Sequence, residues 1–443
     1  MEKEELKSQI ATISKKFLEK TRDKEILVIS HFDTDGITSA AIMIKTLKKL
    51  DKLFSVKILK RIEENFISTL PKNKIILFLD LGSGNLNEIK ESGLKDIFII
   101  DHHETTQEVP ENVDIINPEL YSKQKISASG LTYLFSKSID PENKELAKLA
   151  ILGMIGDNLE KEIGKLNYDI LNDSEIKKKR GLLIYPSTRP LNRTLEFCSN
   201  PYIPGVTGNV RGVLELLRET GLKPTNKGYP SLMELKEEEM AKLVTAIMLR
   251  NPKAKNKEII GDIFLLKMFN KLEDAREMSA KINACSRLGE SDTAIQLCLE
   301  SPKAIKKAES IHAKYRQRIV SGLKFIAENK NLTGKGFEII NAKDEIKDTI
   351  IGTLVSILSN SLLYEEGTIL IGMAYYGNKI KVSARSVGKQ GRNVREILST
   401  VIEKTGGEVG GHKFAAGCML KQEKEEEFIQ GLKKQLEIEL IKI

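Results

Sequence analysis

The sequence has no tryptophan, and its four cysteines are scattered without a Cys-x-x-Cys pair. This spacing argues against a disulfide framework and against a zinc knuckle. No apolar run approaches the roughly 18 residues of a membrane-spanning helix. The N-terminus is charged, with no apolar signal core behind it. Together these absences favour a cytoplasmic protein with no membrane partner.

Histidine is also scarce, with only five in 443 residues. His102 and His103 are adjacent and directly follow the apolar run 97–100. His31 ends another apolar stretch, and His412 lies in a glycine-rich segment, so only His312 stands outside a motif. Polar residues at the end of a buried strand are not typical of a core. The concentration of histidine therefore points to functional sites.

What is present fits an ordinary globular protein. The length allows two or three domains with full cores, and the chain is 40% hydrophobic and 30% charged. Its net charge of +8 is compatible with a polyanionic partner. Charge reports on association and does not by itself establish such a partner.

The first third alternates strands and helices. Continuous apolar runs at 26–29, 75–79 and 97–100, with further strand patterns at 54–59 and 113–116, are separated by helical patterns. Such runs predict a parallel sheet with helices on both faces. We expect this α/β domain to cover residues 1–171.

The remainder divides into two regions. Residues 172–335 contain long charged helical stretches at 231–250 and 301–328, so we expect a helical insertion and connector. The basic run 177–180 is interpreted as a solvated helix face. Residues 336–443 predict a smaller α/β domain with a hairpin around Gly377-Asn378, helices near 349–362 and 394–404, a glycine-rich turn, a strand and a last helix at 423–441.

Acidic and histidine residues recur where the predicted strands end. They are Asp33 and Asp35, Asp80, and the triplet Asp101-His102-His103. In a parallel sheet the carboxyl ends of the strands share one edge, where ligands bind. Asp157, at the end of an apolar helix, is expected to reach the same edge.

Carboxylates that converge repel one another unless a cation compensates them. Carboxylate and imidazole ligands without a thiolate favour Mn²⁺ or Mg²⁺ over Fe or Zn. Five or six ligands exceed the needs of one ion, so two divalent ions bridged by a carboxylate fit better.

Each piece taken alone has a simpler explanation. An Asp-x-Asp-Gly segment is usually a self-capping turn, an Asp after a strand is usually a helix N-cap, and Gly-Gly-His can be a tight turn. The conjunction of all the pieces at one expected binding edge favours a site.

These residues resemble the DHH phosphoesterase superfamily. The motifs are His31-Phe32-Asp33-Thr34-Asp35-Gly36, Asp80 in Leu-Asp-Leu-Gly, Asp101-His102-His103, and Asp157. The segment 410–417, Gly-Gly-His-Lys-Phe-Ala-Ala-Gly, resembles the DHHA1 substrate-binding domain. Segments 186–191 and 200–205 are similar to archaeal RecJ-like members, including the GINS-associated nuclease.

The resemblance implies a DHH domain, a DHHA1 domain and an active-site cleft between the two. It implies a role for each matching residue. His31, Asp33 and Asp80 would hold one Mn²⁺, and the second ion would be held by Asp35, Asp80, His102 and Asp157. His103 would face the scissile phosphate, and Asp101 would orient the histidine pair.

Substrate residues are expected in the C-terminal domain. His412 with Gly410 and Gly411 is predicted to bind phosphate through backbone N–H groups, and Arg385 is a candidate clamp or a simple surface arginine. Ser129, at the start of a helix, either offers N–H and hydroxyl groups to a phosphate or belongs to an N-cap.

Three functions are compatible with these motifs. The first is a RecJ-like exonuclease on single-stranded DNA or RNA in replication and repair, which the length and the extra helical region favour. The second is a nanoRNase or cyclic-dinucleotide phosphodiesterase. The third is a replisome scaffold that binds the GINS complex. With 5% aromatic residues, nucleic-acid binding is expected to depend on phosphates and on salt.

Overall fold

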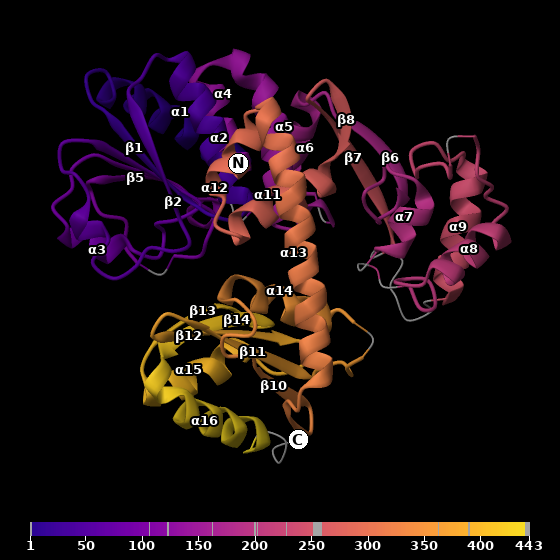
Figure 1. Cartoon of the computed structure of the whole chain (residues 1–443). Coiled ribbons are helices and arrows are strands. Elements are labelled where there is room, and N and C mark those ends of the chain that lie inside the picture. The colour runs from indigo at the N-terminus through magenta and orange to yellow at the C-terminus, as the bar shows by residue number, and fades with distance from the viewer. Residues whose placement is uncertain are drawn as a thin grey trace. The chain divides into compact units, whose positions relative to one another are not determined.

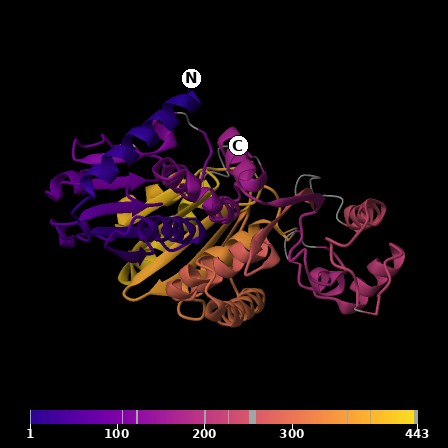
Figure 2. The same cartoon turned by 90° about the horizontal axis from the view of Figure 1, so that it is seen from above.

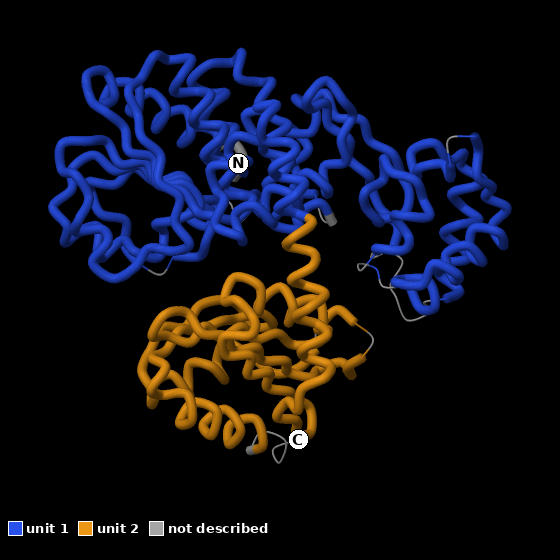
Figure 3. The backbone as a smooth tube through the Cα atoms, in the orientation of Figure 1, with its two compact units in different colours: residues 1–312 blue, residues 313–443 orange. Residues whose placement is uncertain are grey.

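The computed structural model describes residues 2–105, 107–121, 124–161, 163–198, 201, 203–226, 228–250, 259–361, 363–388 and 390–438. The chain forms two compact units, Met1–His312 and Ala313–Ile443 (Figure 3). The predicted domain boundaries at 171 and 335 stay predictions.

A parallel five-stranded sheet forms the centre of the first unit. Its order is β2-β1-β3-β4-β5 (Figure 1), and every neighbouring pair is parallel. The strands are β1 (Ile26–His31), β2 (Phe54–Leu59), β3 (Ile75–Leu79), β4 (Ile97–Ile100) and β5 (Val113–Ile116). The predicted parallel sheet is confirmed. The chain adds β2 on one side of β1 and β3 on the other, so β1 and β3 flank a topological switch point.

Both faces of this sheet are buried, which explains the continuous apolar runs. Along β1, Ile26 and Val28 join one core cluster, whereas Ile29 joins another. The first cluster lies under helices on one face. They are α1 (Glu2–Lys20), α2 (Thr34–Lys49), α4 (Ala128–Ile139), α5 (Ala147–Gly156) and α6 (Lys165–Asp173). On the opposite face α3 (Leu86–Glu91) packs on the second cluster.

The middle region contains a sheet that the sequence pattern did not predict. Strands β6 (Lys177–Leu182), β7 (Ile260–Met268) and β8 (Lys271–Asp274) form an antiparallel ladder. The basic run 177–180 lies in β6, so its interpretation as a helix face was wrong. The physical reason is pairing: Lys178 lies 2.7 Å from Asp262 of β7, and Lys179 donates to the carbonyl oxygens of Met233 and Leu235 at 2.8 Å.

The segment that connects β6 to β7 in the sequence has a separate small core. It is formed by α7 (Leu191–Glu196), α8 (Val210–Glu219) and α9 (Glu237–Arg250). In both views these helices lie to one side of the parallel sheet (Figure 1 and Figure 2). The chain then returns to the first core through α11 (Ala275–Arg287) and α12 (Ser291–Cys298).

The second unit is built on a six-stranded sheet. Helix α13 (Pro302–Glu328) includes the boundary between the units, and the sheet order is β13-β14-β12-β11-β10-β9. The strands are β9 (Leu332–Gly334), β10 (Phe337–Asn341), β11 (Ile369–Tyr376), β12 (Lys379–Ser386), β13 (Glu408–His412) and β14 (Ala415–Lys421). The helices are α14 (Asp348–Ser359), α15 (Val394–Thr405) and α16 (Glu425–Ile438).

Two details of this unit differ from the expectation. The glycine-rich segment 408–412 is strand β13, paired with β14, and the turn lies at Lys413-Phe414. Helix α14 ends at Ser359, earlier than predicted. Positions 362 and 439–441 of the predicted helices lie outside the described residues.

Within the described residues, no helix combines the length and the apolar character needed to cross a membrane.

Candidate metal centre

The strands of the parallel sheet deliver acidic and histidine side chains to one edge. His31 is the last residue of β1, Asp80 directly follows β3, and Asp101 directly follows β4. Because β1 and β3 flank the switch point, His31 and Asp80 meet there: His31 Nδ1 lies 3.2 Å from Asp80 Oδ2. The predicted convergence is therefore present in the structure.

The Asp-x-Asp-Gly segment is both a helix cap and part of the site. Asp33 is the N-cap of α2, and its Oδ1 accepts a hydrogen bond from the Gly36 N–H at 3.0 Å. Its other oxygen lies 3.1 Å from His31 Nδ1. A Cβ at Gly36 would lie 2.3 Å from the His31 carbonyl oxygen, so only glycine fits. The role of Asp33 as a helix N-cap is therefore compatible with a role as a metal ligand.

Asp35, in the first turn of α2, is fully buried against the N-terminus of α4. Its Oδ2 accepts from the Ala128 N–H at 2.6 Å, and its Oδ1 accepts from the Ser129 N–H at 3.0 Å. The helix N-terminus thus orients this carboxylate. Gly153 of α5 makes the room, because a Cβ there would lie 2.4 Å from Asp35 Oδ1. Sequence reasoning missed Gly153, although the segment Gly153-Met-Ile-Gly-Asp157 carried the signal.

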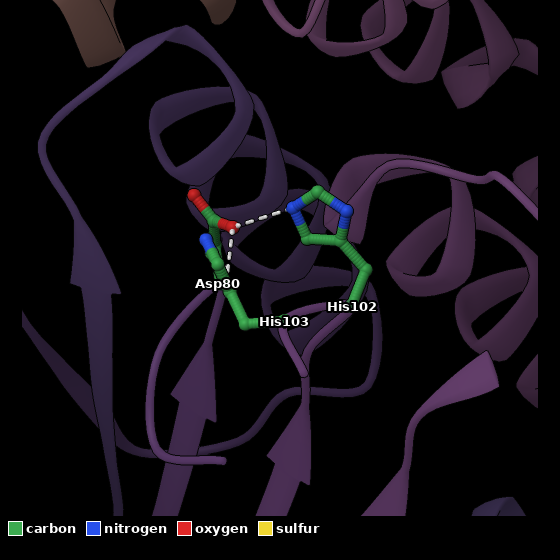
Figure 4. A group of neighbouring side chains, drawn as sticks. All are labelled: Asp80, His102 and His103. Atoms are coloured by element: carbon green, nitrogen blue, oxygen red, sulfur yellow. Dashed lines mark ion pairs between the residues drawn. The ribbon is translucent and has the colours of Figure 1, made fainter. Parts of the chain in front are cut away.

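His102 lies among three carboxylates of the site. Its Nε2 lies 3.4 Å from Asp80 Oδ1, 3.4 Å from Asp157 Oδ2 and 3.9 Å from Asp35 Oδ2. Figure 4 shows His102 and His103 both directed toward the Asp80 carboxylate, with dashed lines for the two ion pairs. Asp80 has a left-handed backbone, with φ at +57°, which costs free energy for a residue other than glycine.

Asp101 lies behind the histidine pair. Its Oδ1 accepts hydrogen bonds from the backbone N–H groups of His102 at 2.8 Å and His103 at 3.3 Å. The same atom lies 2.7 Å from the imidazole Nδ1 of His103. Asp101 is buried, whereas the His103 side chain is 53% exposed. The His103 ring is therefore held on one side and open on the other.

Burial and charge shift the protonation of the cluster. Burial, followed by the charge of Asp80, raises the pKa of Asp35 to about 6. Burial and the charge of Asp35 likewise raise the pKa of Asp157 well above its usual value. Burial opposes ionisation of Asp33 as well, but His31 outweighs it and lowers the pKa of Asp33.

The pKa values of His31 and His102 are raised, although burial alone would lower them. Burial lowers the pKa of His102, but the neighbouring carboxylates of Asp80, Asp157 and Asp35 outweigh it and raise the pKa. The pKa of His31 is raised in the same way by Asp33 and Asp80. The carboxylates of the cluster thus favour positive charge beside them.

The donor set fits divalent metal. Asp80 Oδ1 and Asp157 Oδ2 are buried without a hydrogen-bond partner, although each lies 3.4 Å from His102 Nε2. Buried oxygens of this kind need a proton or a cation. Three overlapping groups of ligand atoms lie within 4.8 Å of one another, namely His31, Asp33, Asp80; Asp35, His102, Asp157; and Asp80, His102, His103.

Comparison with known proteins identifies the architecture. Residues 25–154 match the DHH family, N-terminal domain; residues 184–258 match the DHH-CID domain; and residues 335–437 match the DHHA1 domain. The chain carries DHH, DHH-CID and DHHA1 domains. The predicted family and fold class are confirmed, and with them the enzyme class, a phosphoesterase that hydrolyses phosphodiester bonds. The small core formed by α7, α8 and α9 lies in the DHH-CID domain.

Relatives of the DHH chain cover most of its length. An uncharacterized protein of Methanocaldococcus jannaschii is 29% identical, and the match covers 91% of each chain. The single-stranded-DNA-specific exonuclease RecJ of Bacillus subtilis is 25% identical over 91% of this chain, which spans 44% of that protein.

Two solved structures share the fold. Exonuclease RecJ bound to manganese has a TM-score of 0.58 at 18% identity and covers 96% of this chain and 93% of its own. CDC45 from Entamoeba histolytica has a TM-score of 0.66 at 12% identity and covers 96% and 99%.

The DHHA1 domain places two predicted substrate residues on one face of its sheet. His412 of β13 pairs with Ala415 of β14, which pairs with Arg385 of β12. Paired residues point to the same face of a sheet, so His412 and Arg385 form one row across Ala415. Arg385 Nε donates to Ser356 Oγ at 3.1 Å, which fixes the guanidinium in this row.

The remaining predicted substrate residues have different settings. Gly411 is at φ +116°, and a Cβ there would lie 2.5 Å from the Ala415 carbonyl oxygen, whereas Gly410 has open space around it. Ser129 lies in the first unit, where its N–H donates to Asp35 and its Oγ donates to the Ala150 carbonyl oxygen at 3.2 Å. Ser129 thus supports a candidate metal ligand.

Proposed function

We propose that this protein is a metal-dependent exonuclease that hydrolyses phosphodiester bonds of single-stranded nucleic acid with two divalent ions. The observation that carries the proposal is the position of Asp80. Its Oδ2 lies beside His31, and its Oδ1 lies beside His102. One buried carboxylate therefore connects the His31 and Asp33 group with the Asp35, His102 and Asp157 group.

The donor types match Mn²⁺ or Mg²⁺, because carboxylate oxygen and imidazole nitrogen are present without thiolate. We assign His31, Asp33 and Asp80 to one ion. We assign Asp35, Asp80, His102 and Asp157 to the other. When bound, two such ions supply an activated water and neutralise charge on the phosphoryl group.

His103 contacts the scissile phosphate in this proposal, and Asp101 positions it. Burial lowers the pKa of His103, but the hydrogen bond and charge of Asp101 outweigh it and raise the pKa. A protonated imidazole with one open side can donate to a phosphate oxygen and stabilise developing negative charge. Asp101 holds the Nδ1 proton and leaves the other ring nitrogen for the substrate.

Single-stranded nucleic acid is the proposed substrate because the RecJ of B. subtilis, 25% identical to this chain, is specific for single-stranded DNA. In the DHHA1 domain we assign His412, Arg385, Gly410 and Gly411 to the substrate. The cationic Arg385 fork suits phosphate oxygens.

A second candidate function is a replication partner that binds the GINS complex. Its support is the similarity to the CDC45 structure across nearly the whole chain. The two functions are compatible, since the chain has retained all the expected metal ligands.

The test compares 5′- and 3′-labelled single-stranded DNA and RNA, each with Mn²⁺, Mg²⁺ or EDTA, and records the product ladder. We expect stepwise products from one end, abolished by EDTA. Asp33→Ala and His102→Ala are expected to lose hydrolysis while retaining the unfolding transition. Hydrolysis unchanged in both variants would overturn the metal assignment, and a strong dinucleotide preference would favour the short-substrate alternative.

A further inference from the structure

Asn117 is a buried asparagine at the end of the fifth strand of the parallel sheet. It directly follows β5 and is fully buried. The segments that follow β3 and β4 lie beside it, because β4 pairs with β5 on one side and with β3 on the other. Asn117 therefore lies at the same edge of the sheet as the candidate metal ligands.

The side chain of Asn117 uses both of its polar groups. Its Oδ1 accepts a hydrogen bond from the Glu119 N–H at 2.9 Å, which caps the short helix η2 (Pro118–Leu120). Its Nδ2 donates to the His103 carbonyl oxygen at 2.8 Å and to Ser83 Oγ at 2.9 Å. Aspartate or serine would cap the helix equally well, but neither supplies two N–H donors. Helix capping alone thus does not account for the amide.

The two bonds of the Asn117 amide complete a closed cycle of hydrogen bonds around His103. The Ser83 N–H donates to Asp101 Oδ2 at 3.0 Å, and Asp101 Oδ1 lies 2.7 Å from His103 Nδ1. The cycle therefore runs from the amide through Ser83 and Asp101 to the imidazole, and it returns to the amide from the His103 carbonyl oxygen. It joins the segments that follow β3, β4 and β5. His103 is thus fixed at its backbone as well as at its ring.

We propose that Asn117 is a positioning residue that keeps the His103 imidazole directed at the substrate phosphate. The proposal rests on the proposed function, in which His103 contacts the scissile phosphate. The His103 side chain is 53% exposed, so packing alone does not hold it in place. Loss of the Asn117 amide frees the His103 backbone and leaves the orientation of the ring to Asp101. A displacement of about 1 Å in a reacting group can lower a rate about a hundredfold.

The test measures hydrolysis of a single-stranded oligonucleotide by Asn117→Ala. We expect kcat to fall about 10- to 100-fold, as is usual when a residue that orients a site residue is lost. KM should change less, because His103 acts on charge that develops in the transition state. The Mn²⁺-induced rise in melting temperature is expected to persist, since the candidate metal ligands are unchanged.

Asn112→Ala is the matched control, at the opposite end of β5. The Asn112 amide donates to the Leu94 carbonyl oxygen at 2.7 Å, so this variant also loses an amide-to-carbonyl hydrogen bond. We expect it to keep the wild-type kcat. A kcat for Asn117→Ala equal to that of the control overturns the proposal, and so does loss of the Mn²⁺ response in Asn117→Ala.

A double-mutant cycle shows whether Asn117 acts through His103. Asn117→Ala is compared in the wild-type protein and in a His103→Ala background. We expect its effect on kcat to fall below about threefold in that background, because no imidazole remains to be oriented. An equal loss of kcat in the two backgrounds overturns the proposal.

Ser83→Ala keeps the proposal testable if Asn117→Ala does not fold. This variant removes one acceptor of the Asn117 amide but retains the bond from the Ser83 N–H to Asp101. We expect kcat to fall about three- to tenfold, which corresponds to one neutral hydrogen bond. An unchanged kcat overturns the proposal.

A structural measurement separates this proposal from the proposed function. The chain has only five histidines, so protein isotope-labelled at histidine gives few ring signals by NMR, and those of His103 are assigned from His103→Ala. In metal-free protein we expect the His103 signals of Asn117→Ala to shift toward those of free histidine, and those of Asn112→Ala to match the wild type. Unmoved His103 signals in Asn117→Ala overturn the role of Asn117. A wild-type protein that hydrolyses no nucleic acid contradicts the proposed function instead.

Discussion

At the residue scale, Asp35 couples protonation to metal binding. Burial and the nearby Asp80 raise its pKa to about 6. The folded, metal-free protein therefore binds this proton more tightly than the unfolded chain, and ionisation of Asp35 costs stability as pH rises from about 4 to 6. A divalent ion relieves that cost above pH 6 and competes with the proton below it.

We expect Mn²⁺ to raise the melting temperature strongly at pH 7.5 and weakly at pH 5. The apparent Mn²⁺ affinity should fall by about tenfold or more between these values, because each displaced proton contributes up to tenfold per pH unit below its pKa. Thermal scans with and without MnCl₂ measure the shift. A shift that is equal at both pH values would contradict the assignment of Asp35.

Gly153 provides a second test at the residue scale, and one that avoids the ligands themselves. An alanine Cβ would lie 2.0 Å from Ser129 Oγ and 2.4 Å from Asp35 Oδ1. We expect Gly153→Ala to destabilise the protein by about 1–3 kcal/mol through overpacking, and to weaken Mn²⁺ binding by displacing Asp35. Gly84→Ala is the matched control, since nothing lies within 4 Å of its added Cβ. Equal stability and Mn²⁺ affinity in the two variants would show that α5 can move away.

At the scale of elements, β6 shows how a charged strand can be stabilised. Lys179 Nζ donates to the carbonyl oxygens of Leu232, Met233 and Leu235, just before α9 begins. We expect Lys179→Ala to lower the free energy of unfolding by about 1.5–3 kcal/mol, because buried acceptors lose a charged donor. Lys177→Ala, at an exposed position of the same strand, should have little effect. Urea unfolding of both variants makes the comparison, and equal losses would contradict this role.

Elements were predictable where one physical signal dominates. The β3 run Ile75–Leu79 is apolar at every position because both of its faces are buried, so its strand character is visible locally. The β6 run 177–180 gives the opposite case. Its charges suggested a solvated helix, and its strand conformation depends on pairing with β7, about 80 residues later. Local composition does not contain that information.

At the scale of the whole molecule, the same distinction applies to the site. His31, Asp80 and His102 were predictable together because parallel strands end at one edge. The role of Gly153 was not, because it depends on α5 packing against the N-terminus of α4.

Candidate metal ligands and candidate substrate residues lie in different units, and this separation can be tested. The candidate metal ligands lie in the first unit, and His412 lies exposed on β13 in the second. If His412 binds substrate phosphate, His412→Ala should raise KM for an oligonucleotide by about tenfold, the loss of one charge-assisted contact, with a smaller change in kcat. The Mn²⁺-induced rise in melting temperature should persist, because no metal ligand has changed.

His102→Ala should instead lose kcat and most of the Mn²⁺ response. A His412→Ala variant that loses its Mn²⁺ response would place His412 with the metal ligands, and one with unchanged KM would remove it from the substrate surface.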